Sequence, residues 1–461
     1  MRMKSKEKIE LVTKNLADSI KLGLDQVGNA VAVIEGNGNP KTYHIHARSF
    51  RKIIIKEGHA SDIILSSREI KAIQDGVADA AEATEIDLHV CLRVAAIKGG
   101  VELDVGDKEQ TRIRLTDGKV ELISDGSEIL FYRPASMQPF VLPAADGDLD
   151  LLFKYLNFDE DHAWLLIIWI CFTLSTPRSN HASFPILVLI AEQGASKSTT
   201  CKLIIRSLLD PSQLGIQGFP SNRQDIVIAA NNAHVLIYDN LRYLSQKWSD
   251  TLCIASTGGN DPTRKLYTDA ELVNHPFQVP LVLNGIHDFI EEPDLAQRCI
   301  QLELKSIPED KRRDEKEFTD EFNADLPEIF RGILDLTANI LDKLPTAKVT
   351  HPERMLSFVR YLAAAEEVLN KDSGELQTIY SEILNTSQRD SMLEDPLAST
   401  IYEMMTEGDD HSWDGTATEL LKDIRQFLGD YDPKTRLLPD SPISLAKKLR
   451  PIAAPLRSQK I

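Results

Sequence analysis

The spacing of apolar residues changes several times along the chain, and each change marks a predicted element. Residues 41–55, 64–83 and 89–107 have the patterns of a strand, a helix and a hairpin, respectively. Residues 111–126 continue the alternation of apolar and polar side chains and contain Asp-Gly turn signals. We therefore predict a mixed α/β domain. Residues 132–148 follow it as a linker, because their prolines disfavour helix.

The run FPILVLI, residues 184–190, is apolar throughout, which is the pattern of a strand buried on both faces. Four further strand candidates alternate with helical patterns: residues 213–219, 233–239, 277–284 and 299–304. This alternation predicts a five-stranded parallel sheet with helices on both faces. The apolar stretch 163–174 is too short to span a bilayer and predicts a buried helix.

Composition narrows the class of protein only slightly. Apolar residues make up 42% and charged residues 26% of the 461, as in ordinary globular proteins. The net charge of −18 argues against a surface that coats nucleic acid everywhere, although it permits local basic patches. Five scattered cysteines form no Cys-x-x-Cys pair, which favours reduced, buried thiols. With no signal-peptide pattern, we expect a cytoplasmic protein without membrane contact.

The segment IAEQGASKST, residues 190–199, directly follows the buried strand and resembles a phosphate-binding loop. The consensus G-x-x-x-x-G-K-[ST] has glycines where Ala191 and Ser196 stand, whereas Lys197 and Ser198 match it. Lysine contacts the β and γ phosphates in such loops, and the hydroxyl binds Mg²⁺. We therefore predict an ATP and Mg²⁺ site, rather than a chance string in a strand–helix turn. Its predicted nucleotide-binding residues are Gln193, Gly194, Ala195, Ser196, Lys197, Ser198 and Thr199.

Polar residues at the ends of later strands extend this site. Asp239 ends the strand HVLIYD and would hold Mg²⁺, and Asn240 stands where a water-polarising acid is usual. Asn284 ends the strand PLVLN and would bond the γ phosphate or the attacking water. Arg298 precedes the last strand and would reach the nucleotide of a neighbouring subunit. Taken singly, each residue also fits a helix cap or a solvated surface group.

These motifs, in this order, resemble AAA+ ATPases, in particular the superfamily-3-like helicases of phages, plasmids and integrated elements. The chain is also similar to the helicase half of poxvirus-type primase–helicases and to prophage "ATP-binding proteins", which carry EQGSAKST-like loops and a DN pair. The likeness covers roughly residues 120–461. It implies that Lys197 and Ser198 bind phosphate and Mg²⁺, that Asp239 is the Walker B carboxylate, Asn284 the sensor asparagine and Arg298 the arginine finger.

The resemblance also implies a domain order and a homo-oligomer, usually a hexamer. We predict the following regions: a mixed α/β N-terminal domain (1–143), a helical linker or collar (144–183), an AAA+-like P-loop ATPase core (184–305), a helical lid (306–392) and a winged-helix-like module (393–461). The chain ends at Ile461, where a β-wing would begin, so the module is expected to be truncated or wingless. Arg354 in the lid is a candidate for contact with the γ phosphate, against the alternative of a helix-surface charge.

Two basic segments are candidates for binding single-stranded or forked DNA. Arg264 and Lys265 lie in a stretch that forms a channel hairpin in the related helicases; the alternative is a solvated loop. Lys447, Lys448 and Arg450 lie on a predicted basic helix that Ser441 caps. Asp104 and Asp107 are interpreted as turn residues, so no primase site is predicted.

Two functions remain open. The first is an ATP-driven DNA helicase or translocase of a phage or mobile element. The second is a regulatory or anti-phage defence ATPase with slow turnover, which Asn240 favours because an amide is a poor base. Replication or defence proteins are the expected partners.

Overall fold

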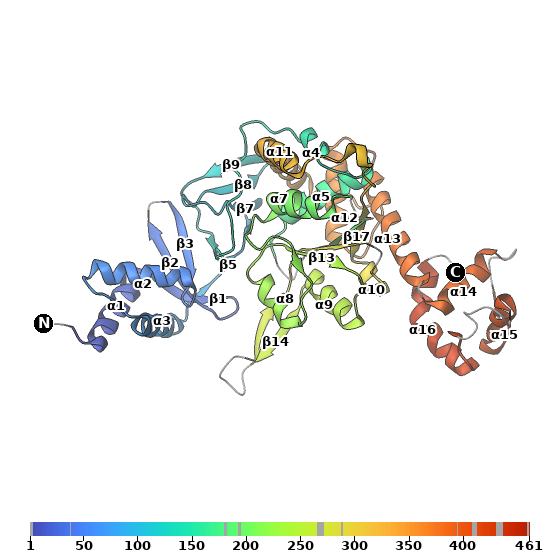
Figure 1. Ribbon diagram of the computed structural model, residues 1–461, viewed down its shortest axis with the longest axis horizontal. Coiled ribbons are helices and arrows are strands. Elements are labelled where there is room, and N and C mark those ends of the chain that lie inside the picture. The colour runs from blue at the N-terminus through green and yellow to red at the C-terminus, as the bar shows by residue number, and fades with distance from the viewer. Residues whose placement is uncertain are drawn as a thin grey trace.

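The computed structural model describes residues 3–36, 38–178, 182–191, 195–264, 272–286, 289–393, 395–407, 413–429, 437–458 and 461. In Figure 1 the N-terminal helices lie at one end of the molecule, the central sheet in the middle and the C-terminal helices at the other end.

The N-terminal unit packs three helices on a four-stranded sheet of order β3-β2-β1-β4. Its elements are α1 (Ser5–Ser19), β1 (Lys21–Asp25), β2 (Ala30–Gly36), β3 (Gly38–His44), α2 (Arg48–Ala60), α3 (Ser67–Glu82) and β4 (Asp87–Leu88). The helix predicted over residues 64–83 is confirmed. The strand predicted over 41–55 is correct only for its beginning, because α2 starts at Arg48. There Phe50 and Ile54, one helical turn apart, are both buried.

A second antiparallel sheet, of order β6-β7-β8-β9, continues the chain. Its neighbourhood comprises β5 (Val90–Cys91), β6 (Val94–Ile97), β7 (Gly100–Asp104), β8 (Arg112–Thr116), β9 (Lys119–Ile123) and β10 (Leu130–Phe131). Buried residues of this sheet, such as Leu103 and Ile113, belong to the same apolar cluster as the helices of the central region. The first 143 residues were predicted as one domain. They are divided between two cores, because this sheet packs against the helices of the central region, whereas α1–α3 enclose a separate apolar cluster.

The central sheet has five parallel strands in the order β12-β13-β16-β11-β17, which confirms the predicted five-stranded parallel sheet. Its strands are β11 (Ile186–Ile190), β12 (Gln217–Gly218), β13 (Leu236–Leu241), β16 (Leu281–Gly285) and β17 (Cys299–Glu303). Leu187 and Leu189 pack into one apolar cluster, whereas Ile186 and Val188 pack into the other. Successive side chains of β11 therefore anchor both helical layers, as expected for a strand buried on both faces.

Helices cover both faces of this sheet and continue beyond it. On the first face lie α4 (Asp150–Phe153), α5 (Glu160–Ser175), α7 (Arg206–Leu209), α11 (Glu315–Lys343), α12 (Leu356–Val368) and α13 (Glu375–Leu393); on the second lie α8 (Arg223–Ala230), α9 (Gln246–Thr257) and α10 (Pro293–Ala296). A 3-10 turn (Glu309–Lys311) precedes α11. The apolar stretch 163–174 lies in α5 and is almost wholly buried, as predicted. No helix in the described ranges combines the length and apolarity needed to cross a membrane.

The C-terminal module consists of α14 (Pro396–Glu407), α15 (Ala417–Leu428) and α16 (Pro442–Ser458) around a small apolar cluster. Between residues 395 and 461, the described segments contain helices and no strand, so they show no β-wing. The predicted cap of the last helix is confirmed, because the backbone N–H of Ser444 donates to Ser441 Oγ at 3.3 Å. Of the five cysteines, four are buried and Cys91 is half-buried.

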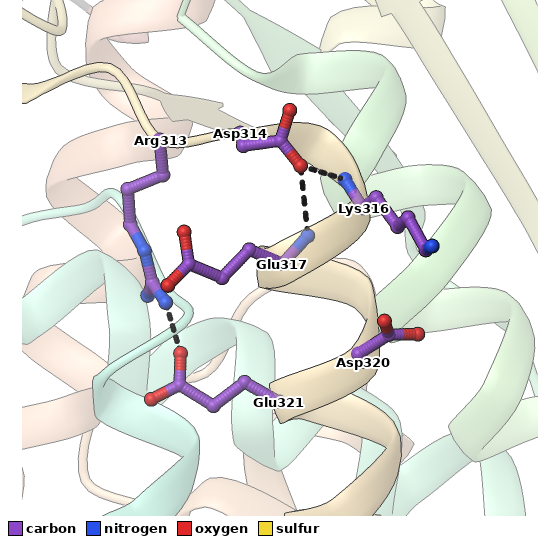
Figure 2. A pocket seen from close by; sticks show the side chains of 6 residues that line it. All are labelled: Arg313, Asp314, Lys316, Glu317, Asp320 and Glu321. Carbon is purple, nitrogen blue, oxygen red and sulfur yellow. Dashed lines mark hydrogen bonds and ion pairs between the residues drawn. The ribbon is translucent and has the colours of Figure 1, made fainter.

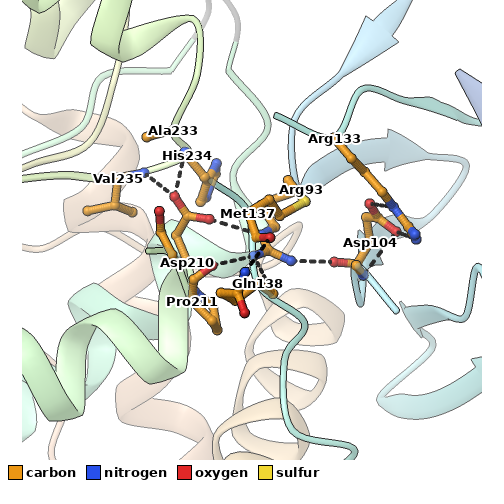
Figure 3. A network of polar contacts seen from close by, with 12 residues as sticks. Arg93, Asp104, Arg133, Met137, Gln138, Asp210, Pro211, Ala233, His234 and Val235 are labelled. Atoms are coloured by element: carbon orange, nitrogen blue, oxygen red, sulfur yellow. Dashed lines mark hydrogen bonds and ion pairs between the residues drawn. The ribbon is translucent and has the colours of Figure 1, made fainter. Parts of the chain in front are cut away.

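A buried polar network joins the second sheet to the end of α7 (Figure 3). Arg93 is fully buried, and its Nε donates to Asp210 Oδ1 at 2.9 Å. Its two terminal nitrogens donate to backbone carbonyls of residues 104, 105, 138 and 211. The other oxygen of Asp210 accepts from the backbone N–H of His234 at 2.8 Å. All the nitrogens of this buried guanidinium therefore have acceptors, which offsets the cost of removing its charge from water.

The same network corrects the prediction that Asp104 is a turn residue. Asp104 ends β7 with no exposed surface, and its carboxylate pairs with Arg112 and with Arg133, whose Nε lies 2.7 Å from Oδ2. Asp107 is a turn residue as predicted, because its carboxylate accepts from the backbone N–H of Thr111 at 2.8 Å. Alternation alone did not distinguish the two aspartates, since the burial of Asp104 depends on pairing with Arg112 on the next strand and with Arg133, 29 positions away.

We predict that Asp210→Asn destabilises the chain by about 3–5 kcal/mol, because Arg93 keeps its charge in the interior without a counter-charge. The urea midpoint of unfolding, followed by circular dichroism, measures the change. The exposed Asp18→Asn is the control and should shift stability by less than about 0.5 kcal/mol. Equal midpoints for both variants would contradict a structural role for the Arg93–Asp210 pair.

A second prediction concerns pH. Burial, together with the charge of Arg178, lowers the pKa of His234 from 6.5 to about 3. His234 therefore binds a proton near pH 6.5 in the unfolded chain but only near pH 3 in the folded chain. The free energy of unfolding therefore decreases as pH falls through this window. Between pH 7 and 5 the loss from this group should be about 2 kcal/mol.

His234→Gln should flatten the fall of the unfolding midpoint between pH 7 and 5, whereas the exposed His89→Gln should leave the slope unchanged. Unfolding curves at pH 5, 6 and 7 provide the measurement. A slope that His234→Gln does not change would show that His234 titrates normally in the folded chain.

Candidate functional site

The loop after β11 emerges at the carboxyl edge of the central sheet. β11 lies between β16 and β17, although it precedes both in sequence. Chain connections therefore diverge here to opposite sides of the sheet, and such switch points are where parallel α/β sheets bind ligands. Gln193 and Gly194 lie outside the described residues. After the loop, α6 (Lys197–Thr199) runs into a π-helical turn, Thr200–Ile205, and then into α7. Short π-helical turns of this kind are frequent at functional sites.

Ser196 adopts the left-handed conformation that the consensus glycine would adopt without cost, with φ 62° and ψ 24°. For a residue with a Cβ atom this conformation costs roughly 1–2 kcal/mol. The conformation reverses the chain directly before the helix begins, and the Thr200 N–H then donates to the Ser196 carbonyl at 2.9 Å. Serine thus holds a left-handed backbone at the position where the consensus has glycine.

The structure brings Lys197, Ser198 and Asp239 together. Ser198 Oγ donates to Asp239 Oδ2 at 3.1 Å, which joins the start of α6 to the end of β13. Lys197 Nζ donates to the Ala191 carbonyl at the start of the loop. Partial burial lowers the pKa of Lys197, and the nearby carboxylate of Asp239 opposes this shift. A hydroxyl and a carboxylate at this separation are two oxygen ligands suited to Mg²⁺.

Asn240 also has a left-handed backbone, with φ 65°, and its N–H donates to Asp239 Oδ1 at 2.7 Å. Asparagine is among the few residues that adopt this conformation readily. Its side chain is exposed at the carboxyl edge. The amide therefore stands beside Asp239, where the sequence analysis expected a group that orients water.

Asn284 lies in β16, paired in register with Leu189 of β11. Only 1% of its surface is exposed, yet neither its side-chain oxygen nor its nitrogen has a hydrogen-bond partner within the described chain. A buried amide without partners costs roughly 1–3 kcal/mol. An orphaned amide between the loop strand and the strand of Asp239 fits a site whose missing partner is a phosphate oxygen or a water. The residues present therefore fit ATP with Mg²⁺.

Arg298 and Arg354 lie away from this group. The Ile186 N–H donates to the Arg298 carbonyl at 2.8 Å, so Arg298 is level with the beginning of β11 rather than its end. Its side chain pairs with Asp294 at 2.8 Å, and Arg354 pairs with the same carboxylate at 2.6 Å. Both arginines thus lie at the amino edge of the sheet, about one strand length away from the loop of their own chain.

The predicted DNA-binding residues occupy two separate places. Arg264 ends β14 (Asn260–Arg264), which pairs with β15 (Leu272–Pro276) in a hairpin that extends from the body in Figure 1. Lys265 lies outside the described residues. Lys447, Lys448 and Arg450 are all exposed on α16. They form a basic face on the last helix of an otherwise acidic chain.

A hollow at the start of α11 is lined by Arg313, Asp314, Lys316, Glu317, Asp320 and Glu321 (Figure 2). Asp314 caps α11 by accepting from the N–H groups of Lys316 and Glu317, each at 3.0 Å. Arg313 pairs with Glu321. Carboxylates outnumber cations around this hollow, so it does not favour phosphate groups.

Two residues that contact predicted site residues were missed from the sequence. Asn157 Nδ2 donates to the Ala195 carbonyl at 3.4 Å and also to the Lys305 carbonyl, and so ties the loop to the end of β17. Asp294 holds both arginines. Its position four residues before Arg298 was a usable signal, because residues at that spacing meet on a helix. No local pattern marked Asn157.

Two family models match separate parts of the chain. Residues 149–374 are similar to the sequence model of the "Actinomycete integrative conjugative element replication protein", and residues 397–461 are similar to that of the "AICE RepA C-terminal domain". Over these residues the chain resembles a replication protein of a mobile element, which agrees with the predicted link to mobile elements. No curated protein matches it.

Two solved apo structures of the "NrS-1 C terminal region" are similar to the chain. The first is 11% identical, covers 91% of this chain and 87% of that chain, and has a TM-score of 0.41. The second is 12% identical, covers 92% and 91%, and has a TM-score of 0.39.

We predict that Asn284→Leu stabilises the ligand-free chain by about 1–3 kcal/mol, because it replaces an unpartnered buried amide with an apolar group of similar size. The same change should weaken nucleotide binding, because the amide is lost. Thermal unfolding without ligand and titration with a fluorescent ATP analogue measure the two effects. Asn231→Leu, on the exposed end of α8, is the control. A destabilised Asn284→Leu variant would show that the amide has a partner in solution.

Proposed function

We propose that this replication protein is an ATP-binding and ATP-hydrolysing P-loop ATPase that moves along DNA as a ring-forming helicase or translocase. The observation that carries the proposal is the contact of Ser198 with Asp239 at the carboxyl edge of the sheet, beside the orphaned amide of Asn284. The family match supports a role in replication of an integrative conjugative element. The ring, predicted as a hexamer, follows from the resemblance described above.

Each side chain has a distinct task in this proposal. The Lys197 ammonium contacts the β and γ phosphates, and it is released from the Ala191 carbonyl when they arrive. Ser198 Oγ and the Asp239 carboxylate hold Mg²⁺, which supplies positive charge toward the phosphate oxygens when bound. Asn284 donates its amide N–H to the γ phosphate or holds the attacking water. Asn240 orients that water without removing its proton.

Nucleic acid would be bound by the basic residues that the acidic chain concentrates in two places. The β14–β15 hairpin carries Arg264 and leads to Lys265, and α16 presents Lys447, Lys448 and Arg450. Basic side chains bind the phosphate backbone with little sequence preference and with strong dependence on salt. This distribution suits a protein that binds DNA locally while the rest of its surface repels it.

The second candidate function is a nucleotide-gated switch with slow turnover. Asn240 favours it, because a general base typically contributes about 10²–10⁴-fold to the rate and an amide cannot act as one. In that case ATP binding, rather than its repeated hydrolysis, would control the assembly of the replication complex.

Lys197→Ala should abolish ATP binding and hydrolysis, because it removes the ammonium that meets the phosphates. The exposed Lys202→Ala, five residues along the same helical segment, should behave like the wild type. We would measure binding of a fluorescent ATP analogue, and hydrolysis during titration with single-stranded DNA. A rate that rises several-fold with DNA supports the motor.

Tight binding with negligible hydrolysis, with or without DNA, would instead support the switch. Normal nucleotide binding by Lys197→Ala would remove the loop from the site and overturn both candidates. The Lys202→Ala control separates a loss of binding in Lys197→Ala from a general effect of losing a lysine on this helical segment.

A further inference from the structure

The outer face of helix α2 in the N-terminal unit is basic. Phe50 and Ile54 lie one helical turn apart and are fully buried, so α2 packs on the core of this unit through their side. Arg48, Lys52 and Lys56 recur at the same spacing on the opposite side, and all three are exposed. These three residues are called the basic row below.

No cation of the basic row has a carboxylate partner among the described residues. The ion pairs found in this unit lie elsewhere and join Lys6 with Glu10, His44 with Asp25 and His46 with Asp75. By contrast, exposed helices of the central region pair their cations within one helical turn, as Arg331 does with Asp335. The positive charge of the basic row therefore faces solvent without a counter-charge from the chain.

Carboxylates near α2 do not cancel this charge. Residues 46–75 contain four of them: Glu57, Asp62, Glu69 and Asp75. Glu57 accepts from Asn15 Nδ2 at 3.1 Å, and Glu69 is buried at the start of α3. Asp75 lies 4.0 Å from His46, and Asp62 is exposed beyond the end of α2. The same residues contain six lysines and arginines, so six cations and four anions leave a net charge of +2 in a chain of −18.

The start of α3 adds further cations beside the basic row. Arg51 Nη2 donates to Ser67 Oγ at 3.1 Å, which brings the first part of α2 next to the first turn of α3. Arg68 and Lys71 are exposed in that turn and the next. The beginnings of the two helices, where the helix dipoles are positive, thus form one basic surface.

The charge pattern of α2 is unfavourable for the helix itself. Like charges four residues apart repel each other, and cations are disfavoured at the beginning of a helix. Ala47 at the N-cap supplies no side-chain hydrogen bond, and the first turn contains no acidic residue. In α3, by contrast, Ser66 and Glu69 form a capping box. A face that costs the helix local stability is expected where the surface serves a negatively charged partner.

We propose that the basic row binds the phosphate backbone of duplex DNA without reading its base sequence. At a rise of about 1.5 Å per residue, the row is about 12 Å long, which is the rise of three to four phosphates of one strand at about 3.4 Å each. Lysine and arginine contacts to phosphates position a protein on DNA but carry no sequence information. The contact requires no ATP.

The position of α2 makes this contact distinct from the nucleic-acid contacts proposed above. In Figure 1, α2 lies at the end of the molecule opposite α16, and the β14–β15 hairpin extends from the body between them. Neither of the family models matches residues 1–148. The basic row therefore gives the N-terminal unit a role of its own, as an anchor on duplex DNA.

Two other anionic partners fit the basic row less well. Proteins that bind single strands combine cations with aromatic side chains on which the bases stack. Phe50 is buried, and α2 has no tyrosine or tryptophan. A helix that lies on a membrane inserts an exposed apolar face, whereas the apolar face of α2 is enclosed in the core of the unit. A stiff helix with a row of cations suits the stiff backbone of a duplex.

Binding of the full chain to a short labelled duplex of mixed sequence, measured by fluorescence anisotropy without nucleotide, tests the proposal. The triple variant Arg48→Ala, Lys52→Ala, Lys56→Ala should bind at least about tenfold more weakly. Its plot of log affinity against log salt concentration should be shallower by about 2–3, because each phosphate contact contributes about 0.9 to the slope. The control variant Lys6→Ala, Lys14→Ala, Lys21→Ala removes the same charge from exposed positions of the same unit. It should change the affinity by less than about threefold.

A single charge reversal separates binding from folding. Lys52→Glu places a carboxylate one turn from both Arg48 and Lys56, so the urea midpoint of unfolding should stay the same or rise. Affinity for the duplex should nevertheless fall about fivefold or more, because a contact is lost and a repulsion is added. A lower midpoint together with weaker binding would show that the row supports the fold, and would overturn the proposal.

Other outcomes also overturn the proposal. Equal losses in the row variant and the control variant would reduce the effect to net charge. A loss for the matched single strand that equals or exceeds the loss for the duplex would assign the row to single strands. Weaker binding to phosphatidylserine vesicles with unchanged duplex binding would assign it to a membrane surface.

The result does not depend on the proposed ATPase. The same losses should appear when the row variant is combined with Lys197→Ala, because no nucleotide is present in the measurement. A wild type that neither binds nor hydrolyses ATP would therefore overturn the proposed function alone. Unchanged duplex binding by the row variant would overturn this inference alone.

Discussion

The burial of β11 on both faces is the constraint on which the rest of the arrangement depends. A strand covered by helices on each side can expose polar groups only at its two ends. At the carboxyl end, the chain leaves the sheet through the loop with Lys197 and Ser198, beside Asp239 and Asn284. At the amino end lie the arginines and Asp294. The sheet therefore separates the two sets of charged groups by the length of its strands.

The second constraint is the buried charge of Arg93. It lies in the segment before β6 yet binds Asp210, which directly follows the helical segment that begins at Lys197. The second sheet is thus fastened to the far end of the same helical segment whose near end forms the loop. Because a buried guanidinium keeps its charge, this attachment cannot loosen without a large cost. The position of the loop is accordingly fixed from both ends, by the sheet at residue 190 and by the network at residue 210.

Much of the central region was predictable from sequence, because its signals are local. Continuous apolar runs mark strands buried on both faces, and residues that end such strands must meet at one edge of a parallel sheet. Asp239 and Asn284 were found in this way. The remainder depends on contacts between different elements: Asp104 resembled a turn residue, but Arg112 on the next strand and Arg133 enclose it, and Arg354 pairs with Asp294, 60 positions away in sequence. No single-sequence pattern encodes which distant cation faces a given carboxylate.

The two departures from the usual loop and strand-end residues have a common physical basis. Ser196 and Asn240 both adopt the left-handed conformation, one on each side of the Ser198–Asp239 contact. At Ser196 the chain accepts a backbone cost that glycine would avoid. At Asn240 it uses a residue that tolerates the conformation, whereas glutamate there would add backbone strain. If the left-handed turn after Asp239 is what aims that carboxylate at Ser198, then the backbone selects asparagine at the position of the usual base. The weakness of Asn240 as a base is then a consequence of how the Ser198–Asp239 pair is oriented.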